Sequence, residues 1–300
     1  MIELIVDSLT KAQNSDGGWG AGRAKASNTE VTSLAVLSLS TVGTPSLKRN
    51  VERGLTWLID RQGENGSFLL STSVKESSWT TALATVCLSQ FKSHLQKAIL
   101  GANWLLGQEG RKLGWLASLF YHLAPEKRNV QLNPDLKGWP WTSGSFSWVE
   151  PTAYALIALK KLKTYLGRNL VEKRIEQGEL MIYDRMCKEG GWNYGNSTVF
   201  GENLWPYPDI TALTLIALQD HQTEEANELS IQSLRKMLAQ NDSGLSLSWS
   251  ILCFSLYGYD TSEWKTLLAR SYEKRGFLGE TKSIALALLA LGKGAEVFRV

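Results

Sequence analysis

Acidic residues recur near the start of apolar, helix-like segments of this sequence. The strings TEVTSLAVL, KESSWTTALA, VEPTAYALIAL, PDITALTLIAL and GETKSIALALL each carry one such carboxylate, namely Glu30, Glu76, Glu150, Asp209 and Glu280. A carboxylate at a helix start binds free amide groups and offsets the helix dipole. Crowded carboxylates also raise one another's pKa, so that one of them can stay protonated and act as a general acid. Both interpretations, capping and acid catalysis, are open at this point.

Aromatic side chains gather around two of these acids. Protonation of an alkene needs a neutral carboxylic acid, and aromatic faces stabilise the carbocation that forms. We therefore predict Asp209 as the first catalytic candidate and Glu150 as the second. The predicted substrate-binding residues are the aromatics of both stretches and the other acids: Trp139, Trp141, Trp148, Tyr154, Trp205, Tyr207, Glu30, Glu76 and Glu280.

Two kinds of helix must position these residues. Residues 47–61 place apolar side chains on one stripe and charged ones elsewhere, which indicates a helix with one solvated face. Other segments are apolar nearly all round and rich in Ala, Ser and Thr, which indicates helices buried on every side. We expect six of these, near residues 28–41, 76–90, 149–162, 209–219, 246–257 and 280–291. Alternation of the two kinds predicts an all-α barrel of helical hairpins, an (α/α)6 toroid with the buried helices inside.

A short motif punctuates these hairpins. In RGLTWLIDRQGENGSF, residues 53–68, an outer-type helix is followed by Gln62, Gly66 and Phe68. AQNSDGGWG repeats the Gln-x-x-x-Gly-x-aromatic spacing near the amino terminus, and weaker copies occur at 101–110, 187–195 and 238–244. Gly supplies a positive φ, the Gln amide binds free backbone groups and the aromatic covers the turn. We interpret these residues as structural staples between hairpins.

The motif closely resembles the Gln- and Trp-rich repeat of squalene-hopene and oxidosqualene cyclases. The hairpin repeats resemble the same superfamily, which includes the protein prenyltransferase beta subunits, and the resemblance covers essentially all 300 residues. It implies a single α-α toroid domain over residues 1–300, with an irregular insertion at about 109–147. Asp209-Ile210-Thr211-Ala212 is similar to the Asp-Cys-Thr-Ala stretch that carries the proton donor in oxidosqualene cyclases.

The sequence also departs from these families. It lacks the Asp-x-Asp-Asp tetrad of squalene-hopene cyclases, and Thr211 stands where the beta subunits have a zinc-binding Cys. Its histidines, His94, His122 and His221, lie outside the starts of the predicted inner helices. We therefore expect no metal site and no cofactor.

Charge and composition argue against nucleic-acid-binding, disulfide-rich and membrane-spanning proteins. The net charge is only +3 and the basic residues are scattered, so nucleic acid is not expected as a partner. The cysteines are Cys87, Cys187 and Cys253, which suggest no disulfide framework, and a reducing cytoplasm fits them best. No apolar run of about 18 residues could span a membrane. A peripheral membrane contact is left open, as is the oligomeric state.

Three functions from different classes follow. In the first, the toroid binds an isoprenoid or similar apolar molecule and cyclises it after protonation, as a terpene cyclase-like isomerase or lyase. The second is a non-catalytic lipid carrier or protein-interaction toroid. The third is a carbohydrate-active (α/α)6 enzyme, which would need two carboxyl groups about 5–9.5 Å apart. The sequence alone leaves open whether the protein is an enzyme.

Overall fold

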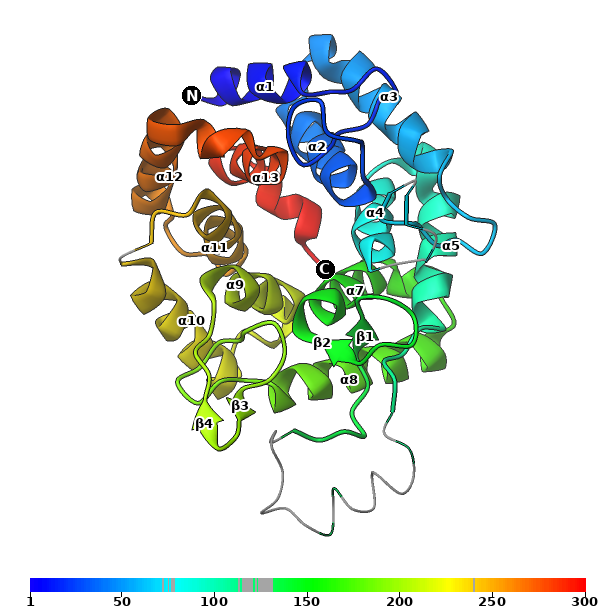
Figure 1. Ribbon diagram of the computed structural model, residues 1–300, viewed down its shortest axis with the longest axis vertical. Helices are drawn as coiled ribbons and strands as arrows, with labels where there is room; N and C mark the ends of the chain where they lie inside the picture. Colours follow the sequence, from blue (N-terminus) through cyan, green and yellow to red (C-terminus); the bar gives the residue numbers. More distant parts are fainter. Residues whose placement is uncertain are drawn as a thin grey trace.

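The computed structural model describes residues 1–300 except 72, 75, 77, 78, 113, 115–120, 122, 124–131 and 240. Its described part forms two concentric rings of helices (Figure 1). The inner ring contains α2 (Thr29–Val42), α4 (Thr80–Ser89), α7 (Val149–Leu162), α9 (Pro208–Ala217), α11 (Gly244–Leu256) and α13 (Thr281–Leu291). The outer ring contains α1 (Ile2–Lys11), α3 (Lys48–Ile59), α5 (Leu95–Leu106), α8 (Arg168–Asp184), α10 (Glu225–Leu238) and α12 (Ser262–Arg275).

Helix contacts close the inner ring. Each inner helix packs against the next along the chain, and α13 packs against α2. Each inner helix also packs against an outer one, with α1 covering α13, so the first and last helices of the chain form one pair. The predicted all-α toroid is therefore confirmed.

Short elements fill the connections. Two-residue strands form the antiparallel hairpins β1 (Trp139–Pro140) with β2 (Ser147–Trp148) and β3 (Thr198–Val199) with β4 (Glu202–Asn203), which lead into α7 and α9. The 3-10 turns are η1 (Pro45–Leu47), η2 (Lys92–His94), η4 (Lys163–Tyr165), η5 (Gln219–His221), η6 (Gly276–Gly279) and η7 (Gly294–Phe298). No helix of the described residues is long and apolar enough to cross a membrane.

Burial separates the two rings as the sequence pattern predicts. In α7 every residue except Lys161 is buried, whereas in α3 only one face is, formed by Val51, Gly54, Leu55, Trp57 and Leu58. The inner helices begin close to the predicted residues with one exception: α4 starts at Thr80, four residues after Glu76. Most of the apolar piece predicted at 114–124, including His122, lies outside the described residues, as does Gln240.

The stapling role predicted for the Gln of the motif is confirmed. Gln13 Nε2 donates to the carbonyls of Gly17 at 2.8 Å and Asn50 at 3.0 Å, which joins the α1–α2 connection to helix α3. Gln62 Nε2 repeats this arrangement one hairpin later, with carbonyls of Gly66 at 3.1 Å and Lys97 at 2.8 Å.

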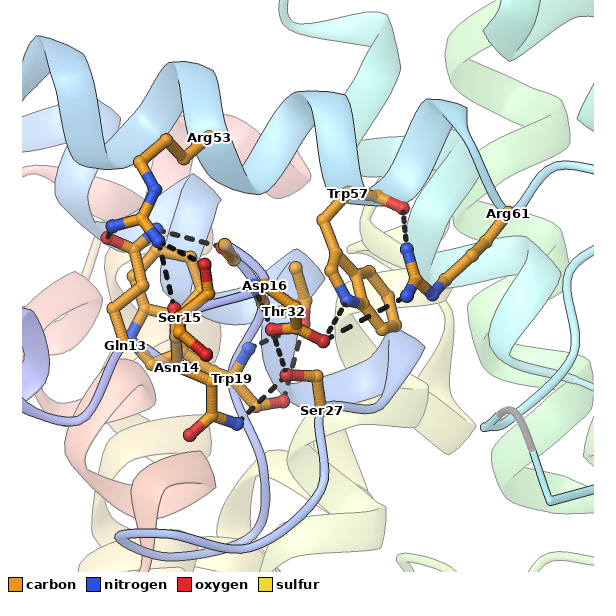
Figure 2. A network of polar contacts seen from close by, with 12 residues as sticks. Gln13, Asn14, Ser15, Asp16, Trp19, Ser27, Thr32, Arg53, Trp57 and Arg61 are labelled. Carbon is orange, nitrogen blue, oxygen red and sulfur yellow. Dashed lines mark hydrogen bonds and ion pairs between the residues drawn. The ribbon is translucent and has the colours of Figure 1, made fainter.

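Other residues of this motif and its neighbours also have structural roles. Gly66 has φ +89°, and a Cβ there would lie 2.3 Å from the carbonyl oxygen of Leu100, so only glycine fits. Trp57 Nε1 donates to the Asp16 carboxylate at 2.8 Å, and the Arg61 guanidinium lies 4.0 Å from the centre of the Trp57 ring (Figure 2). These side chains hold neighbouring hairpins together and take no part in the candidate site.

Candidate active site

A repeated hydrogen bond fixes the register of the inner helices. The hydroxyl oxygens of Thr32, Thr81, Thr152 and Thr211 each accept a hydrogen bond of 2.9 Å from the backbone amide of a buried aromatic residue, respectively Trp19, Phe68, Trp139 and Trp192. Each aromatic belongs to the turn that precedes the helix. The first residues of four inner helices are thereby held in equivalent positions around the ring.

In three of these four helices an acidic residue lies two positions before the threonine. Counting back places Glu30 in α2, Glu150 in α7 and Asp209 in α9 at the second residue of their helices, and α13 has Lys282 at its second residue. In the fourth threonine-bearing helix, α4, the equivalent residue is Trp79.

These residues surround a cavity of about 290 Å³ at the ring's centre, at the amino-terminal ends of the inner helices. Every inner helix or its cap contributes to the wall. The lining residues are Glu30, Trp79, Trp141, Glu150, Tyr194, Asp209, Ile210, Leu213, Leu245, Trp249 and Lys282. Acids, one lysine and four aromatic rings thus face the same small space.

Two of the four charged groups form an ion pair. Lys282 Nζ lies 2.6 Å from Glu30 Oε1, and the two side chains are 20% and 15% exposed. Burial disfavours the charged form of Lys282 and lowers its pKa. The negative charges of Glu30 and Glu150 outweigh this effect, so that the pKa of Lys282 lies above its ordinary value. The ammonium therefore stays charged and offsets one carboxylate of the cavity.

Glu150 has a different environment. It is 6% exposed, and no described residue donates a hydrogen bond to its carboxyl group. Burial raises the pKa of Glu150 from 4.5 to about 7; Lys282 opposes this shift, while the negative charges of Glu30 and Asp209 add to it. A carboxyl group with this pKa is protonated in about half of the molecules at pH 7. Glu150 can therefore act as a proton donor near neutral pH.

Asp209 already accepts a hydrogen bond. The hydroxyl of Tyr194 donates to Asp209 Oδ2 at 3.2 Å. Burial and the charges of Asp209 and Glu150 raise the pKa of Tyr194, so the phenol keeps its proton. On adjacent inner helices, α7 and α9, the structure thus places a protonatable acid and a hydrogen-bonded carboxylate.

Aromatic rings form the rest of the wall. The Trp79 ring lies edge-on to Trp141 with centroids 5.0 Å apart, and stacks on Tyr154 at 5.4 Å. Tyr154 is one helical turn after Glu150 and is fully buried, and its hydroxyl has no hydrogen-bond partner among the described residues. Beyond Tyr154, Trp249 lies at 6.0 Å. Such faces attract a positive charge.

The structure brings together only some of the residues predicted from sequence. Glu30, Glu150, Asp209 and Trp141 line the cavity, and Tyr154 packs beneath it. The predicted ring of five acids is corrected to three acids and a lysine. Glu76 lies four residues before α4 and is exposed, and Glu280 is an exposed cap residue of α13 that accepts a hydrogen bond from Ser283.

Four predicted aromatics lie away from this cavity. Trp139 is a staple: its Nε1 donates to the Leu105 carbonyl at 2.9 Å and the Arg174 guanidinium lies 3.4 Å from its ring centre. Trp148 lines a separate cleft. Trp205 and Tyr207 are 76% and 50% exposed. None of these four side chains lines the cavity, although the Tyr207 ring lies 5.7 Å from the ring of the cavity residue Tyr194.

Sequence reasoning missed seven lining residues: the aliphatic Ile210, Leu213 and Leu245, and the polar or aromatic Trp79, Tyr194, Trp249 and Lys282. For Trp79 the usable signal was the threonine register, which selects the residue two positions before Thr81 rather than the nearest acid. For Lys282 the signal was its place as second residue of α13, equivalent to Glu30 in α2. Nothing local in the sequence marks Tyr194 or Trp249 as part of a cavity.

A second group of titratable residues lies at the opposite end of α7. Ligand atoms of Glu179, Asp220 and His221 lie within 4.8 Å of one another. Lys160 Nζ is already 2.6 Å from Glu179 and 2.5 Å from Asp220, and it donates to the Ala217 carbonyl at 2.8 Å. An ammonium group therefore occupies the place that a cation would take, and we interpret this cluster as structural.

The sequence matches no protein-family model and no curated protein. Its structure, however, is similar to several solved ones. A variant of the type II terpene cyclase MstE from Scytonema, in complex with its substrate geranylgeranyl dihydroxybenzoate, superposes with a TM-score of 0.59 and 15% identity over 99% of this chain and 96% of that one. The chain has the fold of an (α/α)6 toroid.

Two carbohydrate-active enzymes are similar to the same extent. A novel α-amylase from Clostridium perfringens gives a TM-score of 0.62 at 14% identity, with 97% of each chain covered. An inactive variant of the α-1,6-mannanase GH76A of Salegentibacter sp. HEL1_6, in complex with α-1,6-mannotriose, gives 0.61 at 10% identity, over 99% of this chain and all of that one. At these identities the likeness concerns the fold, and the reaction must be argued from the cavity.

Proposed function

We propose that the protein is an acid catalyst that protonates a carbon–carbon double bond of a small isoprenoid, with Glu150 as the proton donor. The observation that carries this proposal is the buried Glu150 carboxyl, whose pKa is raised to about 7 beside aromatic rings. An alkene carbon is a weak base, so its protonation needs an acid that is neutral, close and shielded from water.

Each group of the cavity has a place in this reaction. Glu150 gives its proton to one alkene carbon, and the second carbon becomes cationic. The faces of Trp79, Trp141 and Trp249 and the Asp209 carboxylate stabilise that cation. Attack by a second double bond can close a ring and move the positive charge to another carbon. Loss of a proton from a carbon next to the cation, to the Glu150 carboxylate, then ends the reaction and restores the acid, with or without ring closure. Substrate and product are isomers, and no cofactor is required.

The Lys282–Glu30 ion pair and Tyr194 would hold the carboxylates of the cavity in place for this step. Lys282 holds the Glu30 carboxylate at 2.6 Å, and Tyr194 holds Asp209 at 3.2 Å. Both carboxylates are therefore fixed before the substrate binds, so that negative potential is present where the cation develops. The similarity to MstE, which binds a geranylgeranyl substrate, supports an isoprenoid as the ligand class.

A glycosidase is the second candidate. Glu150 and Asp209 on adjacent inner helices form an acid–carboxylate pair, the arrangement that glycoside hydrolysis uses. The α-amylase and the mannanase among the similar structures support it. Against it stand the wall aromatics and the apolar Ile210, Leu213 and Leu245, which offer a sugar no hydrogen bonds.

We include a peripheral contact with a lipid bilayer in the proposal, because an isoprenoid substrate would dissolve there. Loops that lead into the inner helices, on the side of the cavity, expose Phe200 at 76% and Leu278 at 90%. Leu278→Ser is expected to weaken co-sedimentation with phospholipid vesicles, whereas Leu267→Ser on outer helix α12 should not. Equal sedimentation of both variants and the wild type would refute the contact.

Mass spectrometry of an organic extract of the purified protein tests the ligand class, with a heat-denatured and washed sample as control. A stoichiometric isoprenoid supports the proposal and names the substrate for turnover assays. Glu150→Gln should abolish turnover and Glu76→Gln should leave it unchanged, because Glu76 is exposed and outside the cavity. A bound isoprenoid that is never converted would instead identify a carrier, and conversion of oligosaccharides would favour the glycosidase.

A further inference from the structure

The cavity has a floor made of two aromatic residues whose rings are in contact. Trp249 lines the cavity from helix α11 and is 2% exposed. Behind it lies Phe298, fully buried, with ring centroids 5.3 Å apart and planes inclined by 54°. Tyr154 packs against the side of Trp249 at 6.0 Å. Trp249 therefore separates the cavity from the remainder of the ring's interior.

The second half of this floor belongs to the end of the chain. Phe298 is the last residue of η7, which packs against α2, α4, α11 and α13, and the carboxyl terminus lies near the centre of the ring (Figure 1). The partners of η7 lie at the carboxyl-terminal ends of inner helices. Gln219, just after α9, donates to the Phe298 carbonyl at 2.9 Å, and Gln90, just after α4, to the Val297 carbonyl at 3.5 Å.

This closure limits what the cavity can hold. Ligand pockets usually measure about 300–1,000 Å³, so 290 Å³ is at the lower limit. At about 30 Å³ for each water-sized group, the cavity accommodates roughly ten non-hydrogen atoms. Its acids and Lys282 lie at the amino-terminal ends of the inner helices, and Trp249 lies deeper, so a longer apolar chain that reaches further into the ring meets the indole of Trp249.

We infer that the ligand is a ten-carbon isoprenoid and that Trp249, backed by Phe298, sets this chain length. The inference rests on the proposed function and adds to it the size of the substrate. The alkene end lies near Glu150, and the far end of the chain abuts the indole of Trp249. The terminal turn η7 thus acts as a plug that fixes substrate length.

Replacement of Trp249 or Phe298 by a smaller residue should let the cavity bind a longer isoprenoid. Trp249→Leu removes six non-hydrogen atoms, about the size of one five-carbon prenyl unit. Phe298→Leu leaves the cavity wall intact and frees space only behind Trp249, so its effect should be smaller and in the same direction. Phe254→Leu is the matched control: this buried aromatic lies on the same helix but stacks outward on Trp264 at 4.4 Å.

The experiment measures the binding of geraniol, farnesol and geranylgeraniol, of ten, fifteen and twenty carbons, by native mass spectrometry. Wild type and Phe254→Leu should bind geraniol most tightly. Trp249→Leu should bind farnesol about tenfold more tightly than wild type does, the gain expected from burying two further methylene groups. Circular dichroism of each variant verifies that it folds, and Phe298→Leu repeats the test without a change in the cavity wall.

Three outcomes would count against the inference. Equal binding of geraniol and geranylgeraniol by wild type would overturn the length limit, and an unchanged preference in both Trp249→Leu and Phe298→Leu would overturn the role of the floor. Either result leaves the proposed acid chemistry standing. Failure of wild type and all variants to bind any of the three alcohols would overturn the isoprenoid assignment itself.

Discussion

Replacement of Glu150 by glutamine should make the protein more stable at neutral and alkaline pH. The pKa of Glu150 is raised from 4.5 to about 7 in the folded protein, mainly by burial. The folded state therefore holds this proton more tightly than the unfolded chain does, and stability falls as pH rises from 4.5 to 7. The penalty is absent below pH 4.5 and complete above pH 7.

The size of this stability penalty follows from the pKa shift of Glu150. A difference of about 2.5 pH units, at about 1.36 kcal/mol per unit, amounts to about 3 kcal/mol. Glutamine has nearly the shape of the protonated side chain and no charge, so Glu150→Gln should escape this penalty. The variant should match wild type at pH 4.5 and exceed its free energy of unfolding by up to about 3 kcal/mol at pH 8.

Urea denaturation of both proteins at several pH values between 4.5 and 8 measures this difference, with the exposed Glu76→Gln as control. A difference between Glu150→Gln and wild type that does not change with pH would refute the reasoning. It would mean that Glu150 ionises as an ordinary carboxyl group does, and the proposed reaction would lose its proton donor.

The remaining predictions concern the pH–rate profile, the Lys282–Glu30 ion pair and the Gln62 staple. Turnover should be half-maximal near pH 7 and fall about tenfold per pH unit above pH 8, because only protonated Glu150 donates; a flat pH–rate profile would argue for another acid. Lys282→Met should lower the free energy of unfolding by about 3 kcal/mol, because Glu30, whose side chain is only 15% exposed, is left without its partner. The same variant should move the midpoint of the pH–rate profile upward, since Lys282 lowers the pKa of Glu150; an unmoved midpoint would contradict the proposed electrostatics. Gln62→Ala should cost about 2 kcal/mol in urea denaturation for two lost hydrogen bonds, yet leave turnover unchanged; reduced turnover in a folded protein would place the staple in the site.

Much of the fold could be predicted because it is encoded locally. Whether a helix is apolar on one face or all round decides its ring, and α3 and α7 lie where that pattern places them. The staple could be predicted for the same reason: Gln62 contacts the turn of its own hairpin and the next helix along the chain.

The candidate site could be predicted only in part. Glu30, Glu150 and Asp209 meet because they share a register, which the sequence displays. The choice of the acid nearest each helix start selected Glu76 and Glu280 wrongly, because the nearest carboxylate is not always the residue at the equivalent position. Trp249 and Phe298 are 49 positions apart and meet only through the return of the chain end into the ring. Such long-range packing has no local signal.

Deuterium incorporation tests the central claim most directly. The isoprenoid found in the extract, or geraniol if none is found, would be incubated with the protein in D₂O near pD 6, and the product analysed by mass spectrometry. Proton transfer from Glu150 to carbon predicts one carbon-bound deuterium in the product of wild type and of Glu76→Gln, and none with Glu150→Gln. Deuterium incorporated by Glu150→Gln at the wild-type rate, or conversion by wild type without any incorporation, would contradict the account.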